Sequence, residues 1–256
     1  FFFKQKTAYE ISTRDWSSDV LFRSKPGVIS GLIVAAAVLE ECGVITYQFH
    51  SEDGDEVKTG DVILSCEGST RSILLAERTA LNFLTHLSGI ASLTRKWTEE
   101  ITGTKTKIRD TRKTIPGLRE LEKYAVRCGG GTNHRMTLTD AALIKDNHIA
   151  AVGSLSRAVE RVRARFPNTE IEVEADTLEQ VREALELKVD LILLDNMSIE
   201  ETKRAVAITA GSSTKLESSG GLTLDVAAAY AATGVDYLAV GALTHSAPAL
   251  DIGLDF

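Results

Sequence analysis

Apolar and polar positions follow a regular rhythm over the second half of the chain. From Lys105 onwards, short apolar runs are separated by segments in which apolar residues recur every three or four positions. The runs are typical of buried strands and the separating segments of amphipathic helices. We therefore predict six parallel strands connected by helices. The strands are Lys107–Asp110, Leu143–Lys145, Ile171–Glu174, Leu191–Asp195, Lys215–Ser218 and Tyr237–Val240.

The spacing of these strands indicates the fold class. They recur roughly every 20–35 residues, as the strands of a (β/α) barrel do. Six strands are fewer than the eight of a complete barrel, so the barrel is either incomplete or contains strands that the pattern does not reveal. A doubly wound open sheet is the alternative, but no Gly-x-Gly-x-x-Gly follows the first strand. We expect an α/β protein with an incomplete (β/α) barrel.

The region before Lys105 has a different pattern. A helix is predicted over Gly31–Gly43, and Ile45–Gly68 alternates as antiparallel strands do, with turns at Asp53-Gly54 and Thr59-Gly60. A second helix is predicted over Thr79–Ile101. We expect a smaller N-terminal α/β domain with its connecting helix over residues 25–104, truncated at its start. The barrel then spans residues 105–244, and a tail over 245–256 returns to the first domain.

The first segment, Phe1–Ser24, fits neither pattern. Lys4 and Lys6 follow the three leading Phe residues at once, so the segment lacks the apolar core of a signal peptide. It is similar to a translated synthetic adapter joined to a truncated gene. We expect this foreign segment to stay outside the fold and to pair with no strand of the first domain.

Composition and charge exclude several classes of protein. No stretch approaches the ~18 consecutive apolar residues that a membrane span requires. The net charge of −7 argues against general nucleic-acid binding. Cys42, Cys66 and Cys128 are odd in number and form no Cys-x-x-Cys pair. We therefore expect free thiols in a reducing compartment, a cytoplasmic location, and no nucleic-acid or membrane partner.

Ionisable residues stand at the end of one predicted strand after another. A single charged residue after a strand is usually a solvated loop residue, but five consecutive units are hard to explain in that way. A (β/α) barrel builds its active site from the C-terminal ends of its strands, so the pattern predicts a site at one mouth. The residues are Asp110 with Arg112 and Lys113, Lys145 with Asp146, Glu174, Asp195 and Glu217.

Two segments of small residues follow the last two strands. They are Ser218–Gly221 and Gly241–Thr244. Small residues let backbone N–H groups approach an anion, and the next helix adds its positive N-terminal end. Barrels frequently bind phosphate at their final two loops, so we predict a phosphomonoester site here, with a plain turn as the alternative for Ser-Gly-Gly alone.

Basic residues concentrate in the same predicted region of an otherwise acidic protein. Arginine recognises carboxylates through its planar guanidinium group, and lysine supplies a point charge for phosphates. Gly129–Gly131 precedes two of these residues and allows close approach of the backbone to a ligand. The set predicts a strongly anionic substrate, against the alternative of surface residues that only aid solubility. Its members are Arg112, Lys113, His134, Arg135 and Lys145.

These segments resemble the quinolinate phosphoribosyltransferase family. The matching strings are long, stand in the family's order, and extend from about Pro26 to the C-terminus. They are Glu77–Asn82, Leu87–Ala91, Asp110–Arg119, Lys123–Arg127, Gly129–Arg135, Ile144–His148, Glu172–Glu174, Leu194–Asn196 and Glu217–Gly221.

The resemblance implies a specific reaction and partners. The enzyme would transfer the phosphoribosyl group of phosphoribosyl pyrophosphate to quinolinate, with decarboxylation, giving nicotinate mononucleotide, pyrophosphate and CO₂ for NAD biosynthesis. It implies Mg²⁺ as cofactor and a homodimer whose subunits share active sites. It assigns the quinolinate carboxylates to four residues of one subunit and one of its neighbour. These are Arg112, His134, Arg135 and Lys145, joined by Arg78 from the neighbouring subunit.

The resemblance also assigns the second substrate. Lys113, Glu174 and Asp195 would face phosphoribosyl pyrophosphate, and the two carboxylates would bind Mg²⁺ directly or through water. Together with Lys145 these three are the expected catalytic residues. The 5′-phosphate would be held by backbone N–H groups of Ser219, Gly220, Gly241 and Ala242.

One departure from the family and two alternatives remain. Phe1–Ser24 stands where the family has further helices and an Asp-Leu-Thr-Thr segment, which bears on the first domain and the dimer. A molybdenum-transport-associated paralogue shares the barrel but lacks the strings found here at Asn133–Arg135 and Lys145–His148. The other alternative is an inactive truncated fragment or a binding protein that keeps phosphate affinity without turnover.

Overall fold

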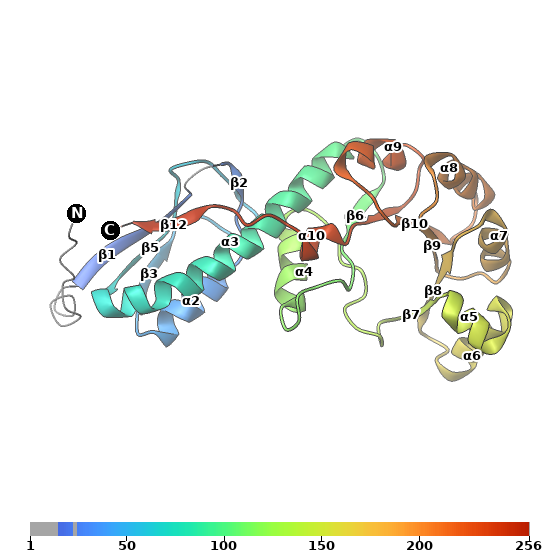
Figure 1. The fold of residues 1–256 in the computed structure, drawn as a ribbon, viewed down its shortest axis with the longest axis horizontal. Helices are drawn as coiled ribbons and strands as arrows, with labels where there is room; N and C mark the ends of the chain where they lie inside the picture. Colours follow the sequence, from blue (N-terminus) through green and yellow to red (C-terminus); the bar gives the residue numbers. More distant parts are fainter. Residues whose placement is uncertain (1–14, 23–24, 256) are drawn as a thin grey trace, which may run out of the picture. The chain divides into compact units, whose positions relative to one another are not determined.

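The computed structural model describes residues 15–22 and 25–255, which form two compact units (Figure 1). The first unit contains the described residues up to Arg95, together with 121–130 and 246–255. The second contains residues 96–120 and 131–245. Within the described residues, no helix has both the length and the apolar character needed to cross a membrane.

The first unit is built on an antiparallel sheet of order β12-β1-β5-β3. Its strands are β1 (Asp15–Phe22), β3 (Thr46–Phe49), β5 (Val62–Ser69) and β12 (Ile252–Asp255). A separate antiparallel pair joins β2 (Gly27–Val28) to β4 (Glu56–Val57). Gly54 and Gly60 adopt φ values of +104° and +90°, which glycine adopts without steric cost, at the two predicted turns.

Strand β1 corrects our expectation that Phe1–Ser24 pairs with no strand of the first domain. It pairs antiparallel with β5 from Asp15 and with β12 from Asp19. Strands β5 and β12 both present backbone N–H and C=O groups to the gap between them, and an extended segment satisfies both edges. Val20 is buried in the core of the unit. Residues 1–14 and 23–24 of the predicted segment lie outside the described residues.

The described residues of the first unit also contain α2 (Leu32–Glu41) and most of α3 (Thr70–Glu100) and α4 (Arg119–Cys128). Helix α3 begins at Thr70, well before the predicted start at Thr79. No loop separates it from β5, which ends at Ser69. Its Leu81, Leu84 and Leu87 are buried. An amphipathic helix is stabilised mainly by such a packed face, and α3 packs this face into the core of the first unit.

The second unit contains a six-stranded parallel sheet of order β6-β11-β10-β9-β8-β7. All six predicted strands are present, with ends that differ by at most two residues. They are β6 (Lys107–Arg109), β7 (Ala141–Ile144), β8 (Glu170–Ala175), β9 (Leu191–Asp195), β10 (Lys215–Ser219) and β11 (Tyr237–Ala239).

The strand order identifies an incomplete barrel and excludes the doubly wound alternative. Strands β7 to β11 are neighbours in chain order, and the first strand, β6, lies beside the last, β11. A doubly wound sheet would instead reverse its order at a switch point. Among the described residues no pairing joins β6 to β7, so the barrel is open there. An isolated parallel bridge between Arg109 and Thr132 lies beside β6.

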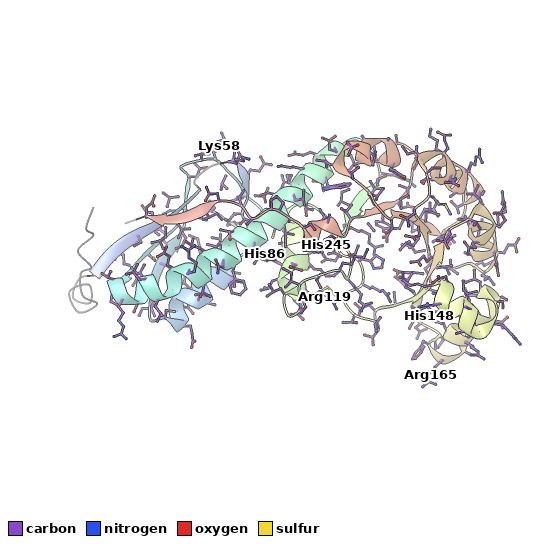
Figure 2. All side chains as sticks on the ribbon, in the orientation of Figure 1. Lys58, His86, Arg119, His148, Arg165 and His245 are labelled. Carbon is purple, nitrogen blue, oxygen red and sulfur yellow. The ribbon has the colours of Figure 1, made fainter. Side chains whose placement is uncertain are left out.

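Helices cover the outer face of this curved sheet (Figure 1). Thr177 and Ser198, the N-caps of α7 and α8, accept hydrogen bonds from the backbone N–H groups of Gln180 and Glu201 at 3.3 Å each. Figure 2 labels His148 on α5 and Arg165 at the end of α6. The elements are α5 (Asp146–Val152), α6 (Leu155–Arg165), α7 (Leu178–Glu186), α8 (Ile199–Ile208), η1 (Leu224–Val226) and α9 (Ala227–Ala231). The short helix α10 (Ala242–His245) follows β11.

Successive residues of the barrel strands point to opposite faces, and the two faces differ in character. Val173, Ile192 and Leu216 are register neighbours across β8, β9 and β10, and all three are buried apolar residues. The next row on these strands contains Glu174, Leu193 and Glu217 and faces the barrel interior. The interior therefore carries charged side chains, and these form the candidate site.

Candidate functional site

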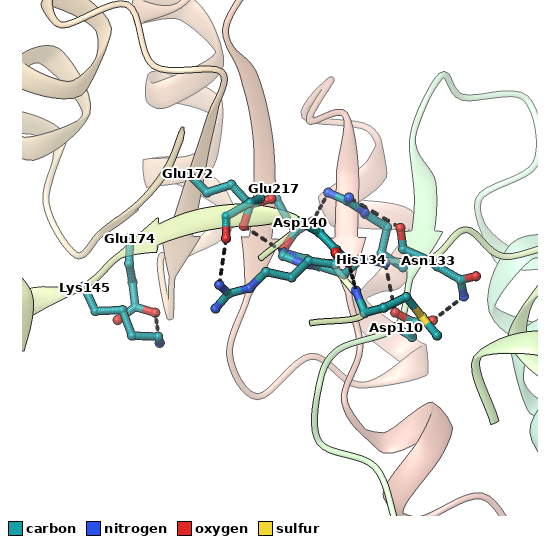
Figure 3. Close-up of polar contacts among 12 residues, drawn as sticks. Asp110, Asn133, His134, Asp140, Lys145, Glu172, Glu174 and Glu217 are labelled. Atoms are coloured by element: carbon teal, nitrogen blue, oxygen red, sulfur yellow. Dashed lines mark hydrogen bonds and ion pairs between the residues drawn. The ribbon is translucent and has the colours of Figure 1, made fainter. Parts of the chain in front are cut away.

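The C-terminal ends of the strands bring several predicted site residues to one end of the barrel. Lys145 directly follows β7, and Glu174 lies near the end of the neighbouring strand β8. The Nζ of Lys145 forms an ion pair with the Oε2 of Glu174 (Figure 3). These two residues therefore lie at the same mouth of the barrel, as parallel strand ends require.

The next strand ends add a carboxylate and a glycine loop. Asp195 and Ser219 are register partners on β9 and β10. The backbone N–H of Asn196 donates to the carbonyl oxygen of Ser219 at 2.9 Å, which joins the two loops. A Cβ at Gly220, which has a φ of +94°, would lie only 2.2 Å from the Oδ1 of Asn196. The loop therefore requires glycine at this position on both conformational and steric grounds.

The loops after the first and last strands also meet. The hydroxyl of Thr244 donates to the carbonyl oxygen of Lys113 at 2.8 Å. A Cβ at Gly241 would lie 3.3 Å from the Cδ of Lys113. The aliphatic part of the Lys113 side chain therefore lies against Gly241, beside the second predicted phosphate loop.

Two details of the predicted strand ends need correction. Glu217 lies inside β10 rather than at its end. The helices after the two loops are short, with three residues in η1 and four in α10. Because a helix dipole sums over aligned peptide units, these helices add little positive potential. The anion-binding capacity of the first loop depends instead on its own backbone N–H groups, where Gly220 and Gly221 both have positive φ.

Arg112 and Arg135 lie within electrostatic range of each other. Burial lowers the pKa of Arg135, and the charge of Arg112 lowers it further, although Glu172 and Asp140 act in the opposite direction. Arg135 donates from Nη1 to the carbonyl oxygen of Ala141 at 3.0 Å. Two neighbouring guanidinium groups repel each other, so this arrangement favours a bound anion such as a carboxylate.

A polar cluster in the barrel interior combines the predicted residues His134 and Glu217 with Arg109 and Glu172, which were not among the predicted site residues (Figure 3). Arg109 donates from Nη1 to the Oε2 of Glu217 at 2.8 Å and stacks on Tyr237, with its Cζ 4.3 Å from the ring centroid. Glu172 and Glu217 are both buried and both face His134. The sequence feature that could have revealed this cluster is a charged residue within a short apolar strand, as in Ile171-Glu172-Val173.

Asp110 fixes the backbone that carries two predicted substrate ligands. It is fully buried directly after β6, and its Oδ1 accepts the backbone N–H of His134 at 2.9 Å. Its Oδ2 accepts the side-chain amide of Asn133 (Figure 3). A carboxylate that accepts two hydrogen bonds sets the conformation of this turn and with it the position of Arg135.

Comparison with known proteins agrees with this geometry. Residues 5–88 match the description "Quinolinate phosphoribosyl transferase, N-terminal domain", and residues 90–255 match the corresponding C-terminal domain. The chain belongs to the quinolinate phosphoribosyltransferase family. The nicotinate-nucleotide pyrophosphorylase [carboxylating] of Mycobacterium leprae is 54% identical over 236 residues, which cover 90% of this chain and 83% of that protein.

Solved structures of the quinolinate phosphoribosyltransferase family share the fold. The nicotinate-nucleotide pyrophosphorylase from Francisella tularensis aligns with a TM-score of 0.94 at 40% identity, covering 97% of this chain and 89% of that chain. NadC from Streptococcus pyogenes aligns with a TM-score of 0.92 at 42% identity, covering 98% of this chain and 88% of that chain. The resemblance and the fold class drawn from the sequence are thereby confirmed.

Arg78, the ligand that the quinolinate phosphoribosyltransferase resemblance places on a neighbouring subunit, belongs to the first unit. It lies within α3. Its side chain is 76% exposed, and its Nη2 lies 3.8 Å from the Oε1 of Glu77. An ion pair with this exposure contributes little to stability, so the guanidinium group can change partner at small cost.

Glu174 and Asp195 are the predicted Mg²⁺ ligands of this family member. Glu174 is the register partner of Leu193, which lies two residues before Asp195, so both carboxylates emerge on the inner face of neighbouring strands. Within the described residues, no group of three His, Cys, Asp or Glu could hold a metal ion. Two carboxylates suit a Mg²⁺ ion that substrate phosphates and water also bind.

Proposed function

We propose that the protein transfers the phosphoribosyl group of phosphoribosyl pyrophosphate to quinolinate, with loss of CO₂. The products are nicotinate mononucleotide and pyrophosphate, and the reaction belongs to NAD biosynthesis. The observation that carries this conclusion is the family match over both domains, together with a barrel mouth that combines cationic side chains and glycine loops. The named relatives are pyrophosphorylases of the carboxylating type.

The quinolinate carboxylates bind to the cationic side of the mouth. Arg112 and Arg135 repel each other in the free protein, and a carboxylate between them removes that repulsion. Lys145 meets the substrate when it exchanges its contact with Glu174 for a substrate carboxylate. The resemblance adds His134 from the same subunit and Arg78 from a second one.

Phosphoribosyl pyrophosphate occupies the glycine-loop side. The backbone N–H groups of Ser219 and Gly220, with those of Gly241 and Ala242, bind the 5′-phosphate. Lys113 lies beside Gly241 and directs its ammonium charge to the pyrophosphate. Glu174 and Asp195 would hold Mg²⁺, directly or through water, and the ion would supply further positive charge for the phosphates.

The chemistry needs orientation and charge more than a covalent intermediate. Loss of pyrophosphate builds positive charge on the ribose anomeric carbon, and the lone pair of the pyridine nitrogen forms the new bond there. Lys113 stabilises the departing pyrophosphate, while the arginines hold the ring in the attacking position. When the neighbouring carboxylate leaves as CO₂, the electron pair of the broken C–C bond stays on the ring carbon, where the positive charge of the adjacent pyridinium nitrogen stabilises it. A proton from solvent takes the place of that carboxylate on the ring.

The proposal includes a homodimer with shared sites and a cytoplasmic location. The dimer is supported by the exposure of Arg78 beside the exposed apolar residues Leu74 and Leu75 on the same helix. The location is supported by the free thiols of Cys42, Cys66 and Cys128.

A spectrophotometric assay tests the proposed reaction. Nicotinate mononucleotide should form only when quinolinate, phosphoribosyl pyrophosphate and Mg²⁺ are all present. Lys145→Ala should be nearly inactive, whereas Lys215→Ala, at the opposite end of the sheet, should retain activity. A protein that binds phosphoribosyl pyrophosphate but forms no product would be a binding protein or an inactive fragment, and the proposal would be wrong.

A further inference from the structure

Arg119, labelled in Figure 2, binds two loops of the second unit through one guanidinium group. Its Nε donates to the hydroxyl of Thr114 at 3.0 Å, and its Nη2 donates to the carbonyl oxygen of Arg112 at 3.4 Å. Its Nη1 donates to the carbonyl oxygen of Met136 at 3.2 Å. All three nitrogens of the group therefore donate to the protein itself, and two of their acceptors are backbone atoms in or beside predicted substrate ligands.

The two loops lie next to the opening of the barrel. Residues 111–118 follow β6 and residues 133–140 precede β7, and these two strands form the edges of the six-stranded sheet. The first loop contains Arg112 and the second contains Arg135. Ladder hydrogen bonds hold neighbouring strands together elsewhere in the sheet, whereas these loops depend on side-chain contacts. Arg119 supplies such a contact between them.

The charges on the two loops favour their separation. Burial lowers the pKa of Arg135, and the nearby charge of Arg112 lowers it further, so the two guanidinium groups repel each other. The Nε of Arg112 is buried and has no hydrogen-bond partner among the described residues, so this atom does not fix the side chain. The planar group of Arg119 opposes the separation, because it binds the backbone of Arg112 and that of Met136, the residue after Arg135.

We propose that Arg119 is a positioning residue for quinolinate, whose guanidinium group fixes the separation of the backbones that carry Arg112 and Arg135. The inference rests on the proposed function for the identity of the substrate. Arg119 acts without touching quinolinate, because its nitrogens are engaged with Thr114, Arg112 and Met136. The substrate carboxylates then meet two guanidinium groups whose spacing is set before binding, which reduces the cost of ordering them.

The loops that face phosphoribosyl pyrophosphate are held by other contacts. Thr244 donates to the carbonyl oxygen of Lys113 at 2.8 Å, and Asn196 donates from its backbone N–H to Ser219 at 2.9 Å. Loss of the Arg119 contacts should therefore weaken quinolinate binding and leave phosphoribosyl pyrophosphate binding nearly unchanged. A residue that only stabilises the fold would not produce this difference between the two substrates.

Calorimetric titration of the full-length protein with each substrate alone measures this difference. Arg119→Lys keeps the positive charge but cannot reach three acceptors at once. The Kd for quinolinate should rise at least about tenfold, or about 1.4 kcal/mol, while the Kd for phosphoribosyl pyrophosphate changes by less than about twofold. Arg163→Lys is the matched control and should change neither value. Arg163 also donates to two carbonyl oxygens, those of Leu187 and Lys188, but it lies on α6.

Two results of this titration would overturn the proposal. One is quinolinate binding in Arg119→Lys that is as tight as in the wild type, since the shape of the guanidinium group would then be unnecessary. The other is equal weakening of both substrates together with a lower melting temperature, which would make Arg119 a purely structural residue.

Chemical rescue separates the shape of the guanidinium group from its charge. Arg119→Ala should bind quinolinate weakly, and added ethylguanidinium chloride should restore part of the affinity, because it can donate to the same carbonyl oxygens. Ethylammonium chloride at the same concentration should restore none. Equal restoration by both cations would contradict the proposal, as would no restoration by ethylguanidinium in a variant that melts as the wild type does.

A milder substitution tests the proposal if neither variant at Arg119 folds. Thr114→Val removes the hydroxyl that accepts from Arg119 Nε, and the Kd for quinolinate should rise about threefold. An unchanged Kd would refute the proposal. Because calorimetry needs no turnover, a wild type that binds quinolinate but forms no nicotinate mononucleotide would refute the reaction alone. A wild type that does not bind quinolinate would refute both.

Discussion

Lys145 and Glu174 form an ion pair across the neighbouring strands β7 and β8. The Lys145 side chain is 40% exposed and that of Glu174 is 15% exposed, so the pair opens to solvent at the barrel mouth. An anionic substrate must compete with Glu174 for the ammonium group. The free protein thus holds the lysine in place and keeps its charge compensated until a carboxylate replaces that of Glu174.

The first prediction concerns the charge of Lys145. Lys145→Met keeps the length of the side chain and removes the ammonium group. We expect kcat/KM for quinolinate to fall by about two orders of magnitude or more, because a charge next to the reacting ring is lost. Steady-state kinetics measure this, with Lys215→Met as the matched control at the other end of the sheet. An equal, small effect of both substitutions would remove Lys145 from the site.

The second prediction concerns the glycine loop after β10. Gly220→Ala must adopt a φ near +94° and push against Asn196, so strain of about 1–2 kcal/mol adds to the clash. We expect phosphoribosyl pyrophosphate binding to be lost while quinolinate binding persists. Gly221→Ala is the control, because its φ is also positive but no atom lies within 4 Å of the added Cβ. Calorimetry showing unchanged affinity in Gly220→Ala would place the phosphate elsewhere.

The third prediction concerns stability at the opposite end of the sheet. Burial raises the pKa of Asp236, but hydrogen bonds from the backbone of Leu216 and the ammonium group of Lys105 outweigh burial, and the net pKa is lowered. A lowered carboxyl pKa stabilises the fold above the unfolded-state value, and this stability is lost as the pH falls through the folded-state value.

Asp236→Asn should therefore lower the free energy of unfolding at pH 7 by about 1–2 kcal/mol, near the lower end for charged hydrogen bonds because solvent screens the lysines. Denaturant titrations should show the difference between wild type and variant shrinking as the solution is acidified below the unfolded-state pKa. Activity at neutral pH should change little, because Asp236 stands before β11 and away from the strand ends of the site. A difference that grows in acid would contradict this assignment.

The fourth prediction concerns Arg78 in the proposed dimer. Arg78→Ala and Lys145→Ala should each be nearly inactive. When the two are unfolded together and refolded, mixed dimers should contain one site with both defects and one with neither, so activity should return. Arg182→Ala, an exposed arginine on α7, is the control that should be active alone. Mixed dimers that form but stay inactive would show that Arg78 serves its own subunit.

The sequence predicted the barrel well because its strands are defined by local patterns. Leu191–Asp195 was predicted with the observed bounds, since an unbroken apolar run suits a strand that is buried along its length. Strand-end residues such as Lys145 and Glu174 were found because parallel strands share one C-terminal edge.

The features that were missed depend on partners far away in the sequence. Strand β1 pairs with both β5 and β12, and its own side chains give no sign of either edge. Glu172 is buried inside β8, where a charge is tolerated only because His134 comes to it from another element. Their roles follow from tertiary contacts, which periodicity along one strand does not encode.

The pairing of first strands with last strands has a consequence for synthesis of the chain. Ile108 of β6 pairs with Leu238 of β11, and Asp19 of β1 pairs with Asp255 of β12. In a chain that emerges from the ribosome, β1 and β6 are exposed long before β12 and β11 are synthesised. The strand edges that later pair with β12 and β11 are unpaired during this time, and unpaired edges promote aggregation. Such long-range pairings also slow folding. Both sheets can reach their native form only after their last strands, β11 and β12, have been synthesised and have emerged.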